Sequence, residues 1–159
     1  MYKRTVIAID PAVSNHTNSD ETGIIVAAID EENIGYVLDD LSGKYTPIEW
    51  AKTAVQAYHT YQADRIVAEV NQGGNMVEQM LRIVDDSVPL KTIHASKGKH
   101  TRAEPIAALY EQGRVFHTKC FRKLEDQMCN FFFQSYKITR QSRCPCLGVN
   151  RINVVTKKS

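Results

Sequence analysis

The first third of the chain consists of short apolar runs separated by polar turns. Residues 3–10, 23–29 and 35–40 each combine β-branched and other apolar side chains over a length typical of a buried strand. The first run ends at Asp10, because Pro11 has no backbone N–H with which to continue a central sheet. Short links join the three runs, and we therefore predict that they form a three-stranded antiparallel meander.

After the meander the pattern alternates between helical and extended periods. Pro47 suits the first turn of a helix, and a strand at 65–70 follows this helix. The alternation continues with predicted helices at 75–84, 102–112 and 121–131, a strand at 90–95 and an extended segment at 114–117. A helix that connects two strands is typical of a parallel βαβ unit. The order therefore predicts an α/β fold with a mixed sheet, the meander plus parallel strands, flanked by helices.

Apolar stripes indicate which side of each helix faces the core. In the helix that opens at Pro47, Trp50 and Ala54 recur at helical spacing with other apolar residues. In the helix at 102–112 we expect three side chains to point inward: Ile106, Ala107 and Tyr110. Gly113 is predicted to end that helix, because glycine readily adopts the left-handed conformation of a C-terminal cap.

Two carboxylates lie at or near the ends of buried strands. Asp10 ends the first strand, and Glu69 lies near the end of the strand at 65–70, 59 positions later. Since α/β sheets usually place ligands at the C-terminal ends of their strands, the two acids suggest a shared metal site. The pattern alone leaves a second interpretation open, in which each acid caps a loop or pairs with a basic side chain.

Composition indicates one ordinary globular domain. The chain has 159 residues, of which 43% are hydrophobic and 24% charged, enough for a normal core. No apolar run reaches the length of a membrane span and no signal segment precedes the first strand, so we expect a cytoplasmic protein without membrane contact. The four cysteines include one Cys-Pro-Cys pair without a second pair, which argues against structural zinc.

Charge divides the chain into two parts. Residues 136–159 contain six basic residues and no acidic one, whereas the whole chain has a net charge of +2, so residues 1–135 carry a net −4. Basic tails are common in proteins that bind nucleic acid, and a DNA-contacting arm is one interpretation of this segment.

Several blocks of the chain resemble the C-terminal nuclease domain of phage terminase large subunits. The blocks follow the family's order within about residues 3–133: Ala8–Pro11, Asp20–Val26, Ala63–Gly74, Ala95–Lys99, Arg102–Ile106, Tyr110–Val115 and Leu124–Met128. The resemblance implies a ribonuclease H-like fold, shared with Holliday-junction resolvases, for a nuclease domain at 1–135.

The same resemblance assigns roles to the two acids. Asp10 matches the first catalytic and metal-binding acid of the family, and Glu69 matches the second. The family cuts DNA with two divalent cations, Mg²⁺ or Mn²⁺. Such cations, about 3.5–4 Å apart, clamp the attacking water and the leaving oxygen of a phosphodiester. Carboxylate and water oxygens are the ligands that Mg²⁺ prefers.

Other residues are candidates for supporting roles. Asp20 follows the first strand and is a candidate for holding a metal ligand in place, although an Asp in a turn is about as common. The candidates for contact with DNA phosphates are Asn71, Gly73, Gly74, Lys97, Lys99 and Arg102. Glycines allow close backbone approach and basic residues pair with phosphate, so these contacts would position DNA without reading its sequence.

The resemblance ends before the family's third acid. The family continues with a segment like Ser-Pro-Asp-Arg-x-Asp-Ala-Leu-Val-Trp-Ala, whose last Asp is a metal ligand, whereas residues 136–159 hold no acid. One choice of codons for residues 137–153, read one nucleotide later, gives Lys-Ser-Pro-Asp-Asn-Leu-Asp-Ala-Leu-Val-Trp-Ala-Leu-Thr-Glu-Leu. We therefore hypothesise that a frameshift produced the tail. Such a shift would remove the third acid and the last amphipathic helix, leaving apolar surface bare.

The sequence thus predicts a nuclease domain of a phage or prophage terminase large subunit that cuts concatemeric DNA during packaging, impaired by the missing acid. Two alternatives remain: an inactive remnant that binds DNA or a packaging partner, and a resolvase-like junction nuclease. The resemblance implies double-stranded DNA, the terminase ATPase domain, the small subunit and the portal as partners, in a bacterial cytoplasm. No Gly-x-x-x-x-Gly-Lys-Ser/Thr phosphate loop occurs, so this chain alone has no packaging motor.

Overall fold

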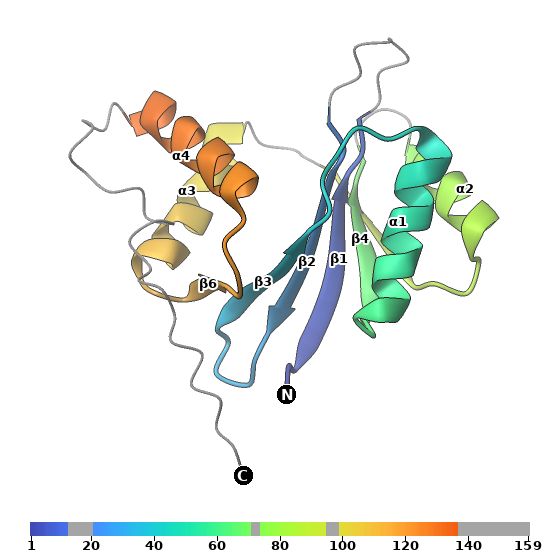
Figure 1. Ribbon diagram of the computed structural model, residues 1–159, viewed down its shortest axis with the longest axis horizontal. Coiled ribbons are helices and arrows are strands. Elements are labelled where there is room, and N and C mark those ends of the chain that lie inside the picture. Colours follow the sequence, from blue (N-terminus) through green and yellow to red (C-terminus); the bar gives the residue numbers. More distant parts are fainter. Residues whose placement is uncertain (13–20, 71–73, 95–98, 137–159) are drawn as a thin grey trace.

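The computed structural model describes residues 1–12, 21–70, 74–94 and 99–136 (Figure 1). The strands are β1 (Arg4–Asp10), β2 (Gly23–Ile29), β3 (Gly35–Asp40), β4 (Arg65–Glu69), β5 (Leu90–Ile93) and β6 (Val115–His117). The helices are α1 (Pro47–Thr60), α2 (Gly74–Val84), α3 (Lys99–Glu111) and α4 (Arg122–Tyr136). The predicted order of elements is confirmed. Within the described ranges, no helix is long and apolar enough to cross a membrane.

The described strands form one mixed sheet in the order β5-β4-β1-β2-β3-β6. The pairs β1–β2 and β2–β3 are antiparallel, as the meander predicts. β4 is parallel to β1, and β5 is parallel to β4, as expected when a helix crosses between strands. β6 adds a parallel strand beside β3 at the opposite edge. The sequence predicted this segment to be extended but did not place it in the sheet.

One face of the sheet carries the hydrophobic core. Side chains alternate along each strand, and every second residue of β1, β2 and β4 is buried beneath α1 and α2. The helices contribute Trp50, Ala51, Ala54, Val77 and Leu81, each no more than 3% exposed. At the start of α1, the Glu49 carboxylate accepts a 2.8 Å hydrogen bond from the Thr46 N–H, which caps the helix.

The other face of the same strands is only half-buried. It presents a second apolar row in β1, β2 and β4: Val6, Ala8, Ile25, Ala27, Ile29 and Val67. In Figure 1 the strands lie between two helix pairs, with α1 and α2 on one side and α3 and α4 on the other, near β6. α3 contacts β6. The half-buried row therefore contrasts with the fully buried row beneath α1 and α2.

A series of hydrogen bonds connects α3, β6 and α4. The Tyr110 hydroxyl lies 2.7 Å from His117 Nε2, and His117 Nδ1 lies 3.0 Å from a Glu125 oxygen. A neutral His117 protonated at Nδ1 satisfies both contacts, accepting from Tyr110 and donating to Glu125. The same Glu125 oxygen accepts the Phe121 N–H at 3.1 Å and so caps the start of α4.

The structure corrects one prediction for α3. Ala107 and Tyr110 are buried as expected, but Ile106 is 46% exposed, so its inward placement was wrong. Apolar residues occur all around this helix, so its pattern could not select one buried face. Gly113 ends the helix region with a φ of +64°, as predicted. The boundary between the predicted domain and tail stays a prediction, because residues 137–159 lie outside the described ranges.

Candidate metal centre

The register of the sheet places Asp10 and Glu69 side by side. β1 and β4 are parallel, and their paired residues run from Val6–Arg65 to Ile9–Ala68. Asp10 and Glu69 come one position after the last pair on each strand. Their carboxylates therefore leave neighbouring strands at the same end of the sheet and on the same face. Asp10 is exposed, whereas the Glu69 side chain is 17% exposed. Both acids therefore end neighbouring strands, as a shared site would require, while their role as metal ligands stays a prediction.

A buried threonine fixes the chain just beyond Asp10. The Ala12 N–H donates to the Thr22 hydroxyl at 3.2 Å, and the Thr22 backbone pairs with Gly43 in both directions at 2.9 and 3.0 Å. Thr22 is 1% exposed, so its polar groups would be costly to bury without these partners. These bonds hold both ends of the segment that follows β1 close to the sheet.

Glu69 is paired with a cation from α3. Arg102 Nη1 donates to Glu69 Oε2 at 2.6 Å, and the arginine side chain is 38% exposed. Arg102 is one of the residues predicted to contact DNA phosphate, and here it contacts one of the two acids. The sequence could not reveal this pair, because the two residues are 33 positions apart on different elements.

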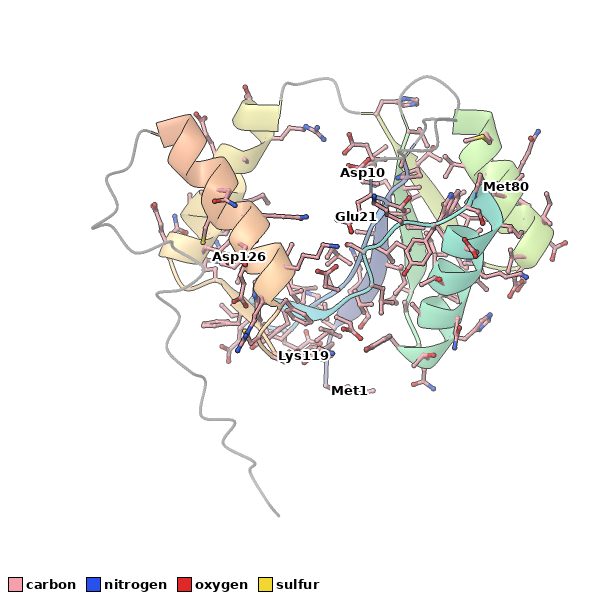
Figure 2. All side chains as sticks on the ribbon, turned by 45° about the horizontal axis from the view of Figure 1, so that its top comes forward. Met1, Asp10, Glu21, Met80, Lys119 and Asp126 are labelled. Atoms are coloured by element: carbon pink, nitrogen blue, oxygen red, sulfur yellow. The ribbon has the colours of Figure 1, made fainter. Side chains whose placement is uncertain are left out.

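A third acid, Glu21, lies near the same end of the sheet and was not among the predicted site residues. Figure 2 shows Asp10 and Glu21 at this end. Lys123 of α4 donates to Glu21, and Gln127 donates to it at 3.4 Å. The hydrogen bond from Lys123 lowers the pKa of Glu21 from its ordinary value. Glu21 comes two residues before Gly23, the partner of Asp10, and this register is the signal that could have identified it.

The structure does not test the remaining predicted residues. Gly74 begins α2 and Lys99 begins α3. The other four predicted positions lie outside the described residues: Asp20, Asn71, Gly73 and Lys97.

The carboxylates of Asp10 and Glu69 fit a hard divalent cation in part. Their oxygens have the right chemistry, and Mg²⁺ is often bound through one or two carboxylates with water and substrate phosphates completing the shell. The Arg102 guanidinium already pairs with Glu69, so a metal ion at this carboxylate would have to share it with, or displace, a positive charge from the chain itself. Among the described residues, however, no group of three or more His, Cys, Asp or Glu side chains could hold a metal.

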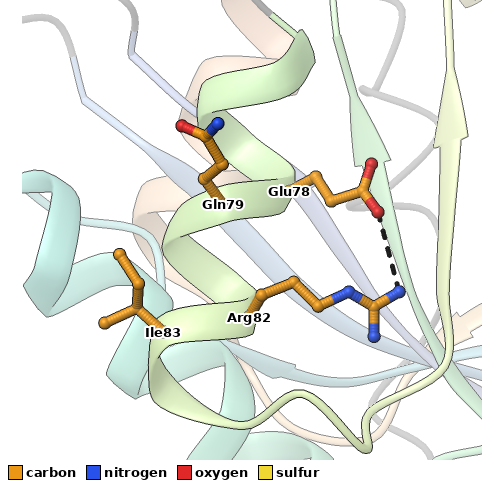
Figure 3. Close-up of a pocket in the computed structure, with 4 residues that line it drawn as sticks. All are labelled: Glu78, Gln79, Arg82 and Ile83. Carbon is orange, nitrogen blue, oxygen red and sulfur yellow. Dashed lines mark ion pairs between the residues drawn. The ribbon is translucent and has the colours of Figure 1, made fainter.

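A separate pocket lies on the outer side of α2 (Figure 3). It is lined by Glu78, Gln79, Arg82 and Ile83 and includes neither Asp10 nor Glu69. Within it, Arg82 Nη2 lies 3.6 Å from Glu78 Oε1, one helical turn away, and both side chains are about half exposed. Because this Arg–Glu pair lies outside the proposed site, its residues can serve as controls for substitutions at Arg102 and Glu69.

Phage terminase nucleases are among the solved structures to which the chain is similar. The large terminase nuclease from thermophilic phage G20c aligns with a TM-score of 0.54 and 15% identity, over 77% of this chain and 62% of that one. The nuclease domain of the large terminase subunit gp2 of bacterial virus Sf6 aligns with a TM-score of 0.46 and 17% identity, over 72% and 48%. The chain thus spans less than two thirds of either terminase structure.

A Holliday-junction enzyme is also similar. T. thermophilus RuvC, in complex with a Holliday junction substrate, aligns with a TM-score of 0.41 and 12% identity, over 90% of this chain and 85% of that one. No curated protein matches the chain. At 15% identity, the likeness to the G20c nuclease shows the fold alone.

A family model gives the more specific result. The terminase RNaseH-like domain matches residues 7–140, which is well over half of the chain and includes Asp10, Glu69 and Arg102. The chain therefore belongs to the terminase RNase H-like domain family.

Proposed function

We propose that this chain is a metal-dependent nuclease domain of a phage or prophage terminase large subunit and cleaves double-stranded DNA. The observation that carries the proposal is the register of β1 and β4, which puts Asp10 and Glu69 on adjacent strand ends in a chain of this family. Paired carboxylates at such a strand edge suit the hydrolysis of phosphodiesters with divalent cations.

The roles of the two acids follow from their positions. Bound Mg²⁺ or Mn²⁺ would supply Lewis acidity and a water of lowered pKa. Asp10 is exposed at the end of β1, so its carboxylate can reach both a cation and solvent. Glu69 is more shielded, so its carboxylate is held in a narrower range of positions. The candidate phosphate contacts Asn71, Gly73, Gly74, Lys97 and Lys99, with Arg102, follow β4 and β5 in the chain and would orient the DNA backbone.

We infer that the activity is impaired. The proposed site has two acids, and residues 136–159 contain none, so the third acid of the family pattern is missing. Fewer carboxylates should bind two divalent cations more weakly. A frameshift before this segment accounts for the loss, and sequencing the gene tests it: nucleotides at codons 137–153 that cannot encode the acidic motif in the next frame would rule it out.

The wider role is also a proposal. The domain would cut concatemeric DNA during genome packaging, in the cytoplasm of a bacterial host, next to a packaging ATPase domain, a small subunit and a portal. The second candidate function is an inactive remnant that binds DNA or a packaging partner. It is favoured by the finding that the described residues hold no cluster of three metal-binding side chains.

Nicking of supercoiled plasmid by the purified chain in Mg²⁺ or Mn²⁺ tests the proposal. The variants are Asp10→Asn and Glu69→Gln, each of which removes one charge with little change in shape. Glu78→Gln is the matched control, because Glu78 is a half-exposed acid on α2 outside the site. A Holliday junction and a linear duplex of the same sequence are compared in parallel.

Each result selects one function. Weak metal-dependent nicking that disappears in Asp10→Asn and Glu69→Gln but persists in Glu78→Gln supports the nuclease. A chain that binds duplex without cutting, while a version with the acidic segment restored does cut, identifies the inactive remnant. Preference for the junction over the duplex would instead favour a resolvase-like enzyme.

A further inference from the structure

The ion pair between Arg102 and Glu69 occupies the carboxylate that the proposed function assigns to a metal. Nη1 and Oε2 are 2.6 Å apart, a short, charge-assisted contact. The two side chains come from different elements, α3 and β4, so the pair is a tertiary contact. The guanidinium therefore supplies, from within the chain, the positive charge that Glu69 would otherwise receive from a cation.

The guanidinium is incompletely satisfied in this position. Arg102 Nε is buried and, among the described residues, has no hydrogen-bond partner. A buried donor without an acceptor is unfavourable, because it loses water and gains nothing in return. An arginine placed purely for structural stability would be expected to use more of its donors, as in the bidentate pairs that arginine commonly forms with carboxylates.

The backbone that carries Arg102 is also weakly tied to its helix. Arg102 lies in the first turn of α3, and Pro105 lies within the helix. Because proline has no N–H, it cannot donate to the carbonyl of residue 101, four positions earlier, and its ring crowds that carbonyl. The helical turn that carries Arg102 therefore lacks one backbone hydrogen bond to the rest of α3. Moving this turn costs correspondingly less free energy.

We propose that Arg102 is a resident counter-cation of Glu69 that competes with divalent metal for this carboxylate. The inference rests on the proposed function, because it requires a cation to bind at Asp10 and Glu69. Metal binding displaces the guanidinium from Glu69, and the displaced guanidinium becomes available to a DNA phosphate. Arg102 is thus a positioning residue that links the metal-free state of the site to its metal-bound state.

Calorimetric titration of the whole chain with Mn²⁺, without DNA, tests the competition. Arg102→Gln removes the competing charge, so Mn²⁺ should bind about 2- to 5-fold more tightly, the range expected for a partly exposed ion pair. Arg102→Lys keeps a cation and should stay close to the parent chain. Arg82→Gln is the matched control, because Arg82 is a similarly exposed arginine paired with Glu78, and it should leave the affinity unchanged.

The outcomes separate this inference from the proposed function. Mn²⁺ binding that requires Asp10 but is equal or weaker in Arg102→Gln overturns the competition and leaves the metal site standing. Absence of Mn²⁺ binding in both the parent chain and Arg102→Gln overturns both proposals. Mn²⁺ binding that is detected in Arg102→Gln but not in the parent chain supports the competition and shows that Arg102 excludes the metal ion.

A second measurement does not depend on whether the Arg102→Gln variant folds. The side-chain Nε–H resonance of Arg102 in the parent chain, assigned with Arg102→Lys, should shift as Mg²⁺ is added, because the guanidinium leaves Glu69. The Nε–H resonance of Arg82 should stay constant in the same titration. An Arg102 resonance that does not move when the site is saturated would contradict the displacement.

Discussion

The two helix pairs are attached to the sheet by different kinds of interaction. α1 and α2 bury an apolar face on β1, β2 and β4, with Trp50 and Ala54 almost fully enclosed. Among the described residues, α3 and α4 share only a small apolar cluster with β6. Ion pairs join each of them, and the segment between β6 and α4, to acids on the sheet side: Arg102–Glu69 from α3, Lys123–Glu21 from α4 and Lys119–Asp39 from the connecting segment. One pair builds the stable scaffold, and the other brings charged side chains to the proposed site.

This difference has a consequence for dynamics. Apolar burial resists local opening, whereas partly exposed ion pairs contribute little, so the α3–α4 pair should open before the rest of the domain. The half-buried row that includes Val6, Ile25 and Val67 would then be exposed further. Under the frameshift hypothesis, the amphipathic helix of the family pattern would be a natural cover for such a surface.

The largest effect should come from the apolar half. Trp50→Ala removes the largest of the fully buried side chains and should lower the free energy of unfolding by about 3–5 kcal/mol. Urea denaturation followed by circular dichroism measures the change. Ile83→Ala, at a position that is 67% exposed, serves as the control and should change stability by less than about 0.5 kcal/mol. Equal losses in the two variants would contradict the assigned core.

A smaller and more local effect is expected in the polar half. His117→Ala leaves Tyr110 and Glu125 without their shared partner and should cost about 1–3 kcal/mol. Hydrogen exchange should accelerate in α3 and α4 while β1 and β4 keep their protection. Uniform acceleration across all helices would show that the two halves unfold as one unit.

The polar half should also respond to acid. Burial raises the pKa of Glu125, but hydrogen bonds from His117 and the Phe121 N–H outweigh it, and the net pKa lies below the ordinary value. A lowered folded-state pKa stabilises the fold above the unfolded-state pKa, and this contribution disappears as the pH falls through the folded value. Exchange protection of α4 should therefore decrease below about pH 4. Glu125→Gln should flatten this dependence, and an unchanged profile would contradict the assignment.

The smallest effect is expected at the exposed edge. Lys123→Ala removes an ion pair in which the lysine is 57% exposed, so the stability loss should be below about 1 kcal/mol and should vanish at high salt. Thermal unfolding at low and high salt measures it. A large, salt-independent loss would mean that α4 depends on this contact more than its exposure indicates.

The sequence predicted most where local pattern dominates. The bounds of β2 and β3, the start of α1 and the buried Trp50 follow from alternation, helical spacing and Pro47. The same pattern failed for Ile106, because α3 has no single apolar stripe. Local pattern could not predict contacts between residues far apart in the chain. The pairing of β6 with β3 and the contact of Arg102 with Glu69 both depend on tertiary packing. The sequence placed Asp10 and Glu69 at or near the ends of buried strands, but the pairing of β1 with β4 that brings them together came from the structure.

The most direct test of the account is to locate a bound cation. Mn²⁺ added in small amounts should broaden backbone amide signals most strongly at the ends of β1 and β4, around Asp10 and Glu69, because paramagnetic relaxation falls steeply with distance. Asp10→Asn should remove this broadening, whereas Glu78→Gln should leave it intact. Broadening centred on another part of the molecule, or broadening that survives Asp10→Asn, would contradict a metal centre formed by these two acids.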